Sequence, residues 1–195
     1  MKRLRVIIAA VLAFFFLTPA VVSAQTQSMT KKEKRKIEKM QRQKEKTKKQ
    51  EAAHAYYLAL INHKHFVFQA DYLTDTQGNS FILDQTINFM AVEGDSAVLQ
   101  FGFDNLVGWN GVGGLTLRGI LYNYKVQQGK KGNGINVHTD VRVIGPGLPP
   151  HINLYVSDDG SAQLTINTGV GDQITLFGTI VSPEDANIFR GVPLF

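Results

Sequence analysis

The chain contains no cysteine, although it is 195 residues long and 44% of its residues are hydrophobic. It can therefore form no disulfide bond, no thiolate metal site and no thiol nucleophile. The composition is that of a globular protein rather than a disordered one. Burial of apolar side chains alone must therefore hold the fold together.

The sequence also lacks the local motifs of the commonest enzyme classes. It has no His-Glu-x-x-His helix, no Gly-x-Ser-x-Gly turn and no Gly-rich phosphate loop. We therefore expect no cofactor. His63 and His65 have the spacing of two metal ligands on one strand face, but no third ligand is evident. Surface histidines are the simpler interpretation, and we expect no metal.

The net charge of +5 is distributed unevenly along the chain. Residues 25–51 hold 11 basic and 4 acidic side chains, whereas residues 52–195 hold 7 basic and 12 acidic ones. A nucleic-acid-binding domain carries its positive charge on the folded face. Because the part of this chain that should fold is acidic, we exclude nucleic acid as its partner.

The N-terminus has the three parts of a signal peptide. A basic start precedes an apolar run at 6–17, and Val22-Ser23-Ala24 forms a small-residue cleavage site. The apolar run is too short for a membrane-spanning helix, which needs roughly 20 residues. We expect residues 1–24 to be removed after Ala24 and the protein to be exported, to the periplasm or in association with the cell envelope.

Residues 25–51 form the second part, a basic helical or flexible spacer. Thr30 and Glu33 have the spacing of a capping box, which predicts where a helix begins. Ile37 and Met40 are the only large apolar residues between 31 and 50, so a coiled coil is not expected. A solvated spacer is the simplest interpretation. A basic arm that makes peripheral contact with anionic lipid head groups or an acidic polymer is the alternative.

Residues 52–195 form the third part, a mainly β domain. Residues 52–61 have the apolar spacing of an amphipathic helix. Beyond residue 65 the hydrophobic period changes to two, which is typical of strands. Eight runs are strand-like: 65–73, 80–92, 96–103, 115–126, 135–144, 151–157, 161–168 and 173–181. Short turns between them predict a single antiparallel meander that closes as a barrel or packs as a sandwich.

A short C-terminal helix is predicted to close the domain. Ser182 and Pro183 have the residue types of a helix start, and Gly191 those of a helix end. We expect a helix from about 183 to 190 that packs Ile188 and Phe189 against the sheet.

The candidate ligand site lies around the loop at 108–114, which holds the only tryptophan and four glycines. Such a loop covers the core or presents an aromatic platform to a ligand. The following strand carries an arginine and two tyrosines that should share one face, at the mouth of a barrel. The candidate residues are Trp109, Asn110, Arg118, Tyr122 and Tyr124.

Five segments in this order resemble an uncharacterised family of exported proteins from Bacteroides-type anaerobes, catalogued as a domain of unknown function. The segments are 64–70 (KHFVFQA), 94–95, 99–102 (LQFG), 108–114 and 188–191 (IFRG). The resemblance covers roughly 52–195. It implies a small, mostly β domain beyond the inner membrane, and it transfers no catalytic residue.

Three functions remain open. The first is a non-enzymatic exported binding or envelope-associated module for an unknown small molecule or envelope component. The second is a hydrolase of envelope material that uses distant carboxylates, for which Asp71, Asp84, Asp104 and Asp140 are available. The third is a small outer-membrane barrel, suggested by the eight runs and the terminal phenylalanine.

Overall fold

A computed structural model defines the fold. It describes residues 30–74, 77–102, 113–129, 134–143, 149–167 and 173–191. The chain divides into two compact units, residues 1–42 and 43–195, and the described strands all belong to the second.

One long helix, α2 (Lys31–Asn62), precedes the strands. The amide of Thr30 donates to Glu33 Oε2 at 2.8 Å, and the amide of Glu33 donates to Thr30 Oγ1 at 3.4 Å. This reciprocal pair confirms the predicted capping box. In the part of the chain that the structure describes, no helix has both the length and the apolarity needed to cross a bilayer.

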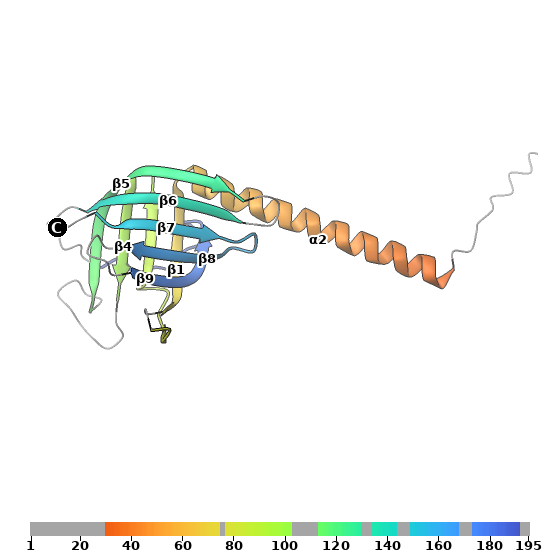
Figure 1. The fold of residues 1–195 in the computed structure, drawn as a ribbon, viewed down its shortest axis with the longest axis horizontal. Coiled ribbons are helices and arrows are strands. Elements are labelled where there is room, and N and C mark those ends of the chain that lie inside the picture. The colour runs from red at the N-terminus through yellow and green to blue at the C-terminus, as the bar shows by residue number, and fades with distance from the viewer. Residues whose placement is uncertain are drawn as a thin grey trace, which may run out of the picture. The chain divides into compact units, whose positions relative to one another are not determined.

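Nine strands follow among the described residues, and eight of them close into an antiparallel barrel (Figure 1). Each strand pairs with the next along the chain from β3 to β9, β1 pairs with β3, and pairing between β1 and β9 closes the ring. β2 is an extra strand on β1. Of the two predicted architectures, the barrel is therefore the correct one. The strands are β1 (His65–Thr74), β2 (Ser80–Ile82), β3 (Phe89–Glu93), β4 (Ser96–Phe101), β5 (Leu115–Gln128), β6 (Ile135–Val143), β7 (His151–Val156), β8 (Ser161–Asn167) and β9 (Gln173–Val181).

The predicted run at 80–92 is two strands instead of one. Between β2 and β3, Asp84 Oδ1 accepts the amide of Thr86 at 2.8 Å, and the carbonyl of Asp84 accepts the amide of Asn88 at 3.0 Å. An aspartate that binds the backbone two residues ahead forms a turn in place of a ladder. The chain therefore leaves β2 and re-enters the sheet as β3.

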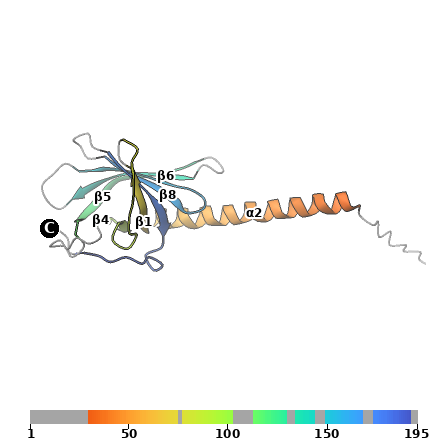
Figure 2. The same cartoon turned by 90° about the horizontal axis from the view of Figure 1, so that it is seen from below.

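The interior of the barrel is filled with side chains. Phe66, Phe68 and Met90 are among the largest residues of a core that also includes buried side chains from β6 to β9. The last turns of α2 lie against this sheet (Figure 2), and Ile61 is fully buried in the same core. A small cavity of about 10 Å³ lies beside Met90 and Ile152, which is room for about one water molecule.

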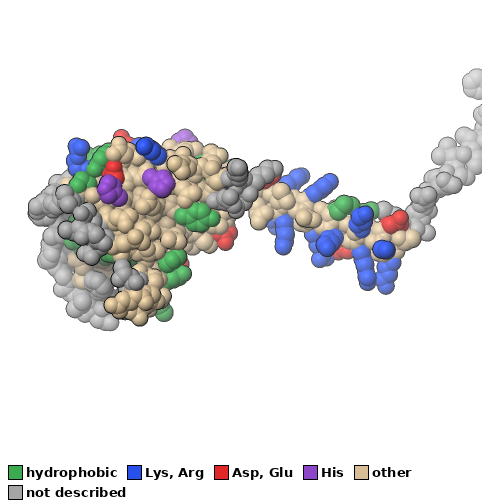
Figure 3. Space-filling model, in the orientation of Figure 1, with side chains coloured by type: hydrophobic (Ala, Val, Ile, Leu, Met, Phe, Trp, Pro, Cys, Tyr) green, Lys and Arg blue, Asp and Glu red, His purple; other side chains and the backbone are tan. Residues whose placement is uncertain are grey.

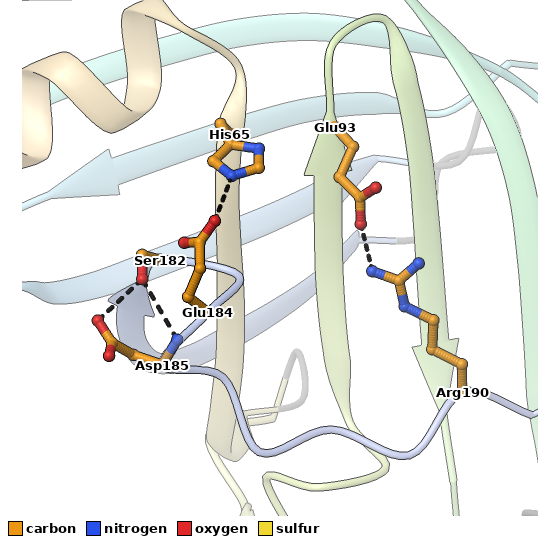
Figure 4. Close-up of polar contacts among 6 residues, drawn as sticks. All are labelled: His65, Glu93, Ser182, Glu184, Asp185 and Arg190. Carbon is orange, nitrogen blue, oxygen red and sulfur yellow. Dashed lines mark hydrogen bonds and ion pairs between the residues drawn. The ribbon is translucent and has the colours of Figure 1, made fainter.

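The predicted C-terminal helix is wrong. Ser182 starts a single turn, in which its Oγ accepts the amide of Asp185 at 3.3 Å, and the chain then runs extended to Gly191. Ion pairs of Glu184 with His65 and of Arg190 with Glu93 attach this C-terminal segment to the sheet (Figure 4).

Hydrogen bonds to the barrel explain the extended course of this segment. The amide of Phe189 donates to the carbonyl of Thr86 at 2.8 Å, and the carbonyl of Asn187 accepts from Gln69 Nε2 at 3.3 Å. These groups are therefore not paired within a helix. Ile188 packs as expected, over a second small apolar cluster, but Phe189 is 59% exposed.

Candidate functional site

The outer surface of strands β5 to β9 and of the end of β1, here called the outer wall, is mostly polar. In β6 the buried Ile135 and Val137 alternate with outward-facing residues such as His138 and Arg142, as the period-two pattern predicts. Apolar side chains thus fill the barrel, and mostly polar ones face outward, with exposed exceptions such as Ile120.

A β-bulge interrupts this wall in the middle of β5. Tyr122 pairs with Asp140, but the next regular pair joins Lys125 to His138, so one extra residue is accommodated in β5. Asn123 takes up the irregularity with φ of 53°, a left-handed conformation that asparagine tolerates better than most residues. Bulges redirect side chains and are frequent next to functional sites.

The bulge overturns one expectation about the candidate residues. Tyr122 and Tyr124 do not share a face, because the extra residue turns Tyr124 into the barrel while Tyr122 stays outside with Arg118. The hydroxyl of Tyr124 donates to the carbonyl of Ile61 in α2 at 2.8 Å, and burial raises the pKa of this phenol above its usual range. Tyr124 therefore joins the helix to the core. Trp109 and Asn110 lie outside the described residues.

A hydrogen-bonded cluster surrounds the bulge on the outer wall. Asn123 Nδ2 donates to Asp140 Oδ2 at 2.7 Å, and Asp140 Oδ1 pairs with Nδ1 of His151. The Asn123 hydrogen bond, with a smaller contribution from His151, holds the pKa of Asp140 below its ordinary value. Beside them the guanidinium of Arg142 lies 5.4 Å from the ring centre of Tyr122. The cluster can hold a fixed negative charge and orient an exposed imidazole.

Further along the same wall, cross-strand pairing aligns five residues from five neighbouring strands. We call them the amide–aromatic row: Asn136, Tyr155, Gln163, Phe177 and Tyr72, in the order β6, β7, β8, β9 and β1. The rings of Phe177 and Tyr72 stack with their centres 4.8 Å apart. Sequence reasoning missed this row because these residues are far apart in the chain and come together only through the register of five strands.

One member of the histidine pair considered as a metal site, His65, contacts an acidic side chain. Nε2 of His65 lies 2.9 Å from Glu184 Oε1, a contact that lowers the pKa of the Glu184 carboxyl (Figure 4). Across the described ranges, no three His, Asp or Glu side chains are grouped as a metal would require.

Two open grooves lie elsewhere on the second unit. One of about 430 Å³ is lined by Gln50, His54 and Asp158, and there His54 Nδ1 lies 2.7 Å from Asp158 Oδ1. The other, of about 450 Å³, is lined by Tyr56, Leu60 and neighbours near the start of β1.

Comparison with known proteins matches an uncharacterised family. A family model described as a domain of unknown function (DUF4251) matches residues 43–180. A crystal structure of a DUF4251 family protein from Bacteroides eggerthii DSM 20697 is 25% identical in sequence, with a TM-score of 0.57. The similarity covers 70% of this chain and 91% of that one. A search of curated proteins gave no match. The resemblance seen in the sequence is thereby confirmed.

Proposed function

Because the chain belongs to the DUF4251 family, whose function is unknown, family membership supplies no activity, and we propose from the geometry that it is a non-enzymatic exported binding module. Its working surface in this proposal is the outer wall of the barrel. The ligand is an envelope component or a small molecule.

The observation that supports this proposal is the contrast between the inside and the outside of the barrel. Buried side chains pack the described interior, and the cavity beside Met90 and Ile152 is only about 10 Å³, far below the usual size of a ligand pocket. The wall exposes aromatic rings, side-chain amides and the Asp140 cluster. This polarity also favours the module over an outer-membrane barrel, whose apolar band faces outward.

Export and attachment are the second part of the proposal. The N-terminal sequence has the order of a signal peptide, and the surplus of basic residues in 25–51 suits contact with an anionic surface. From Lys31 to Gln50 the side chains are exposed apart from the half-buried Ile37. In the native host the mature protein should begin at Gln25, which intact-mass measurement would detect. An unprocessed mass would contradict the proposed export.

The binding proposal is tested by an inventory of molecules that co-purify from the native host. Wild-type protein should retain a component that mass spectrometry identifies. The double variant Tyr122→Ala and Tyr155→Ala, which alters the wall, should retain less of it. A matched control is Tyr56→Ala, since Tyr56 is a similarly exposed tyrosine on α2, at 46%. Equal retention by all three proteins would contradict the placement of the site on the wall.

A hydrolase is the second candidate, and the Asp140–His151 pair is the observation that favours it. A carboxylate at Nδ1 orients an imidazole so that its other nitrogen can exchange protons with a substrate. The side chain of His151 is 66% exposed and that of Asp140 is 14% exposed, so substrate could reach the imidazole. Release of fragments from cell-wall or polysaccharide preparations, abolished by Asp140→Asn, would establish this function in place of the first.

A further inference from the structure

The amide–aromatic row crosses the strands at nearly right angles. Its members are direct register partners: Asn136 with Tyr155, Tyr155 with Gln163, Gln163 with Phe177, and Phe177 with Tyr72. Neighbouring strands are about 4.8 Å apart, so five strands place these side chains along a line of about 19 Å. Figure 3 shows this side of the barrel, where separate hydrophobic patches lie within a mostly uncharged surface.

The aromatic members of the row are held in place by their surroundings. The ring of Tyr155 lies against the backbone at Gly134, where an added Cβ would be 2.9 Å from two of its atoms. It nevertheless remains 39% exposed. Tyr72 is also 39% exposed and stacks on Phe177, with an angle of 12° between the ring planes. The row therefore offers two fixed aromatic positions, two strands or about 10 Å apart.

Side-chain amides occupy the positions between and beside these rings. Gln163 lies between Tyr155 and Phe177, and Asn136 lies on the other side of Tyr155. Among the residues that the structure describes, neither amide group has a hydrogen-bond partner within the protein. Each can donate and accept at once. Two residues further along β7 and β8, Asn153 and Thr165 extend this supply of uncharged polar groups.

The composition of the row limits the kinds of ligand that would fit it. Every member of the row is uncharged, so a polyanion or a polycation would find no opposite charge in it. A purely apolar ligand would bury the amides without partners, which costs free energy. An added peptide strand needs an exposed sheet edge, whereas the row crosses the paired interior of a closed sheet.

We propose that the amide–aromatic row binds a neutral glycan chain that lies across the strands. Sugar rings have apolar faces that pack on aromatic side chains and hydroxyl groups that pair with amides, and the two aromatic positions are separated by about the length of a disaccharide. One ring over Gln163 can reach both Tyr155 and Phe177. This inference rests on the proposed function and adds the class of ligand and its direction on the wall.

The test uses the mature protein and neutral hexasaccharides of glucose, xylose and mannose in β- and α-linked forms, with alginate oligomers as the anionic counterpart. At least one neutral hexasaccharide should bind measurably by calorimetry, and Tyr155→Ala should weaken its affinity roughly tenfold. Tyr155→Phe keeps the ring and should retain most of the affinity. Gln163→Leu should weaken binding several-fold, and Tyr56→Ala should leave it unchanged.

The outcomes separate this inference from the proposed function. Binding that Tyr56→Ala weakens as much as Tyr155→Ala would overturn the row as the site, and preference for alginate would overturn the ligand class. No binding of any neutral hexasaccharide at millimolar concentration would also overturn the inference, while the native-host inventory would still decide whether the wall binds something else. Thermal unfolding of each variant shows whether a loss of binding comes from a loss of folding.

Discussion

Gln100 should be the most sensitive polar position in the fold, because one buried side chain joins three parts of the chain. It is 0% exposed. Its Nε2 donates to the carbonyls of Ile87 at 3.1 Å and Phe189 at 2.8 Å. Its Oε1 accepts from Thr116 Oγ1 at 3.1 Å and from the amide of Gly191 at 2.8 Å. Four hydrogen bonds use all of the donors and acceptors of the amide group.

The change Gln100→Leu keeps most of the volume and removes all four hydrogen bonds. A buried hydrogen bond contributes about 1 kcal/mol net, so the loss of four costs about 4 kcal/mol. Burial of the more apolar leucine side chain offsets about 1 kcal/mol of this loss. We therefore expect the free energy of unfolding to fall by about 3 kcal/mol, a large share of the 5–15 kcal/mol typical of a domain. The C-terminal segment should also detach more readily.

Urea unfolding of the mature protein measures the first effect, and hydrogen exchange at residues 186–191 measures the second. Gln163→Leu is the matched control, because it makes the same change on the exposed wall and should alter stability by less than about 0.5 kcal/mol. Equal unfolding midpoints for the two variants would refute the importance assigned to the buried amide. Unchanged exchange in the C-terminal segment would refute the attachment.

Three further predictions concern the contact of Tyr124 with α2, the close approach of β9 to β1, and the Asp140 cluster. Tyr124→Phe removes the phenol that donates to α2 and should lower stability by about 1 kcal/mol in urea titration, and no change would show that this bond is unimportant. Gly178→Ala places a Cβ 1.9 Å from the carbonyl oxygen of Gln69, so circular dichroism should show a severely destabilised or unfolded protein, and a wild-type melting curve would contradict this contact. The pKa of Asp140 is lower in the folded protein than its unfolded value of about 3.9, so the ionised carboxylate stabilises the fold at pH values above about 3.9. This stability is lost as the pH falls through the folded pKa, and Asp140→Asn should therefore flatten the fall of the urea midpoint between about pH 5 and 2. An equally steep fall in the variant would refute that contribution.

The regular parts of the fold could be predicted from the sequence because they follow from side-chain period and turn residues. β6 alternates buried and more exposed residues, and β9 has the predicted bounds 173–181. The C-terminal helix failed because side chains bind backbone from a distant part of the chain, whereas the run at 80–92 is divided by a local turn at Asp84. The Gln69 and Gln100 amides hold the C-terminal segment extended, although Ser182 and Pro183 locally favour a helix.

The candidate site was less predictable, because a single inserted residue changes which side chains share a face. Counting by twos from Arg118 places Tyr122 and Tyr124 together, but the bulge at Asn123 separates them. The amide–aromatic row depends on four strand registers at once, and no local pattern encodes it. Conversely, the pairing of Asp140 with His151 joins two residues whose individual chemistry was visible in the sequence but whose contact was not.

The most direct test of the outer wall as the binding surface is a nuclear magnetic resonance titration of the mature protein with envelope extract from the native host. Outward and inward residues alternate along β7, so the two sides of one strand report separately. The side-chain amide signals of Asn136, Asn153 and Gln163 should shift, while the methyl signals of the buried Ile152 and Leu154 stay in place. Shifts confined to those buried methyl groups would place the ligand inside the barrel and contradict a binding surface on its wall.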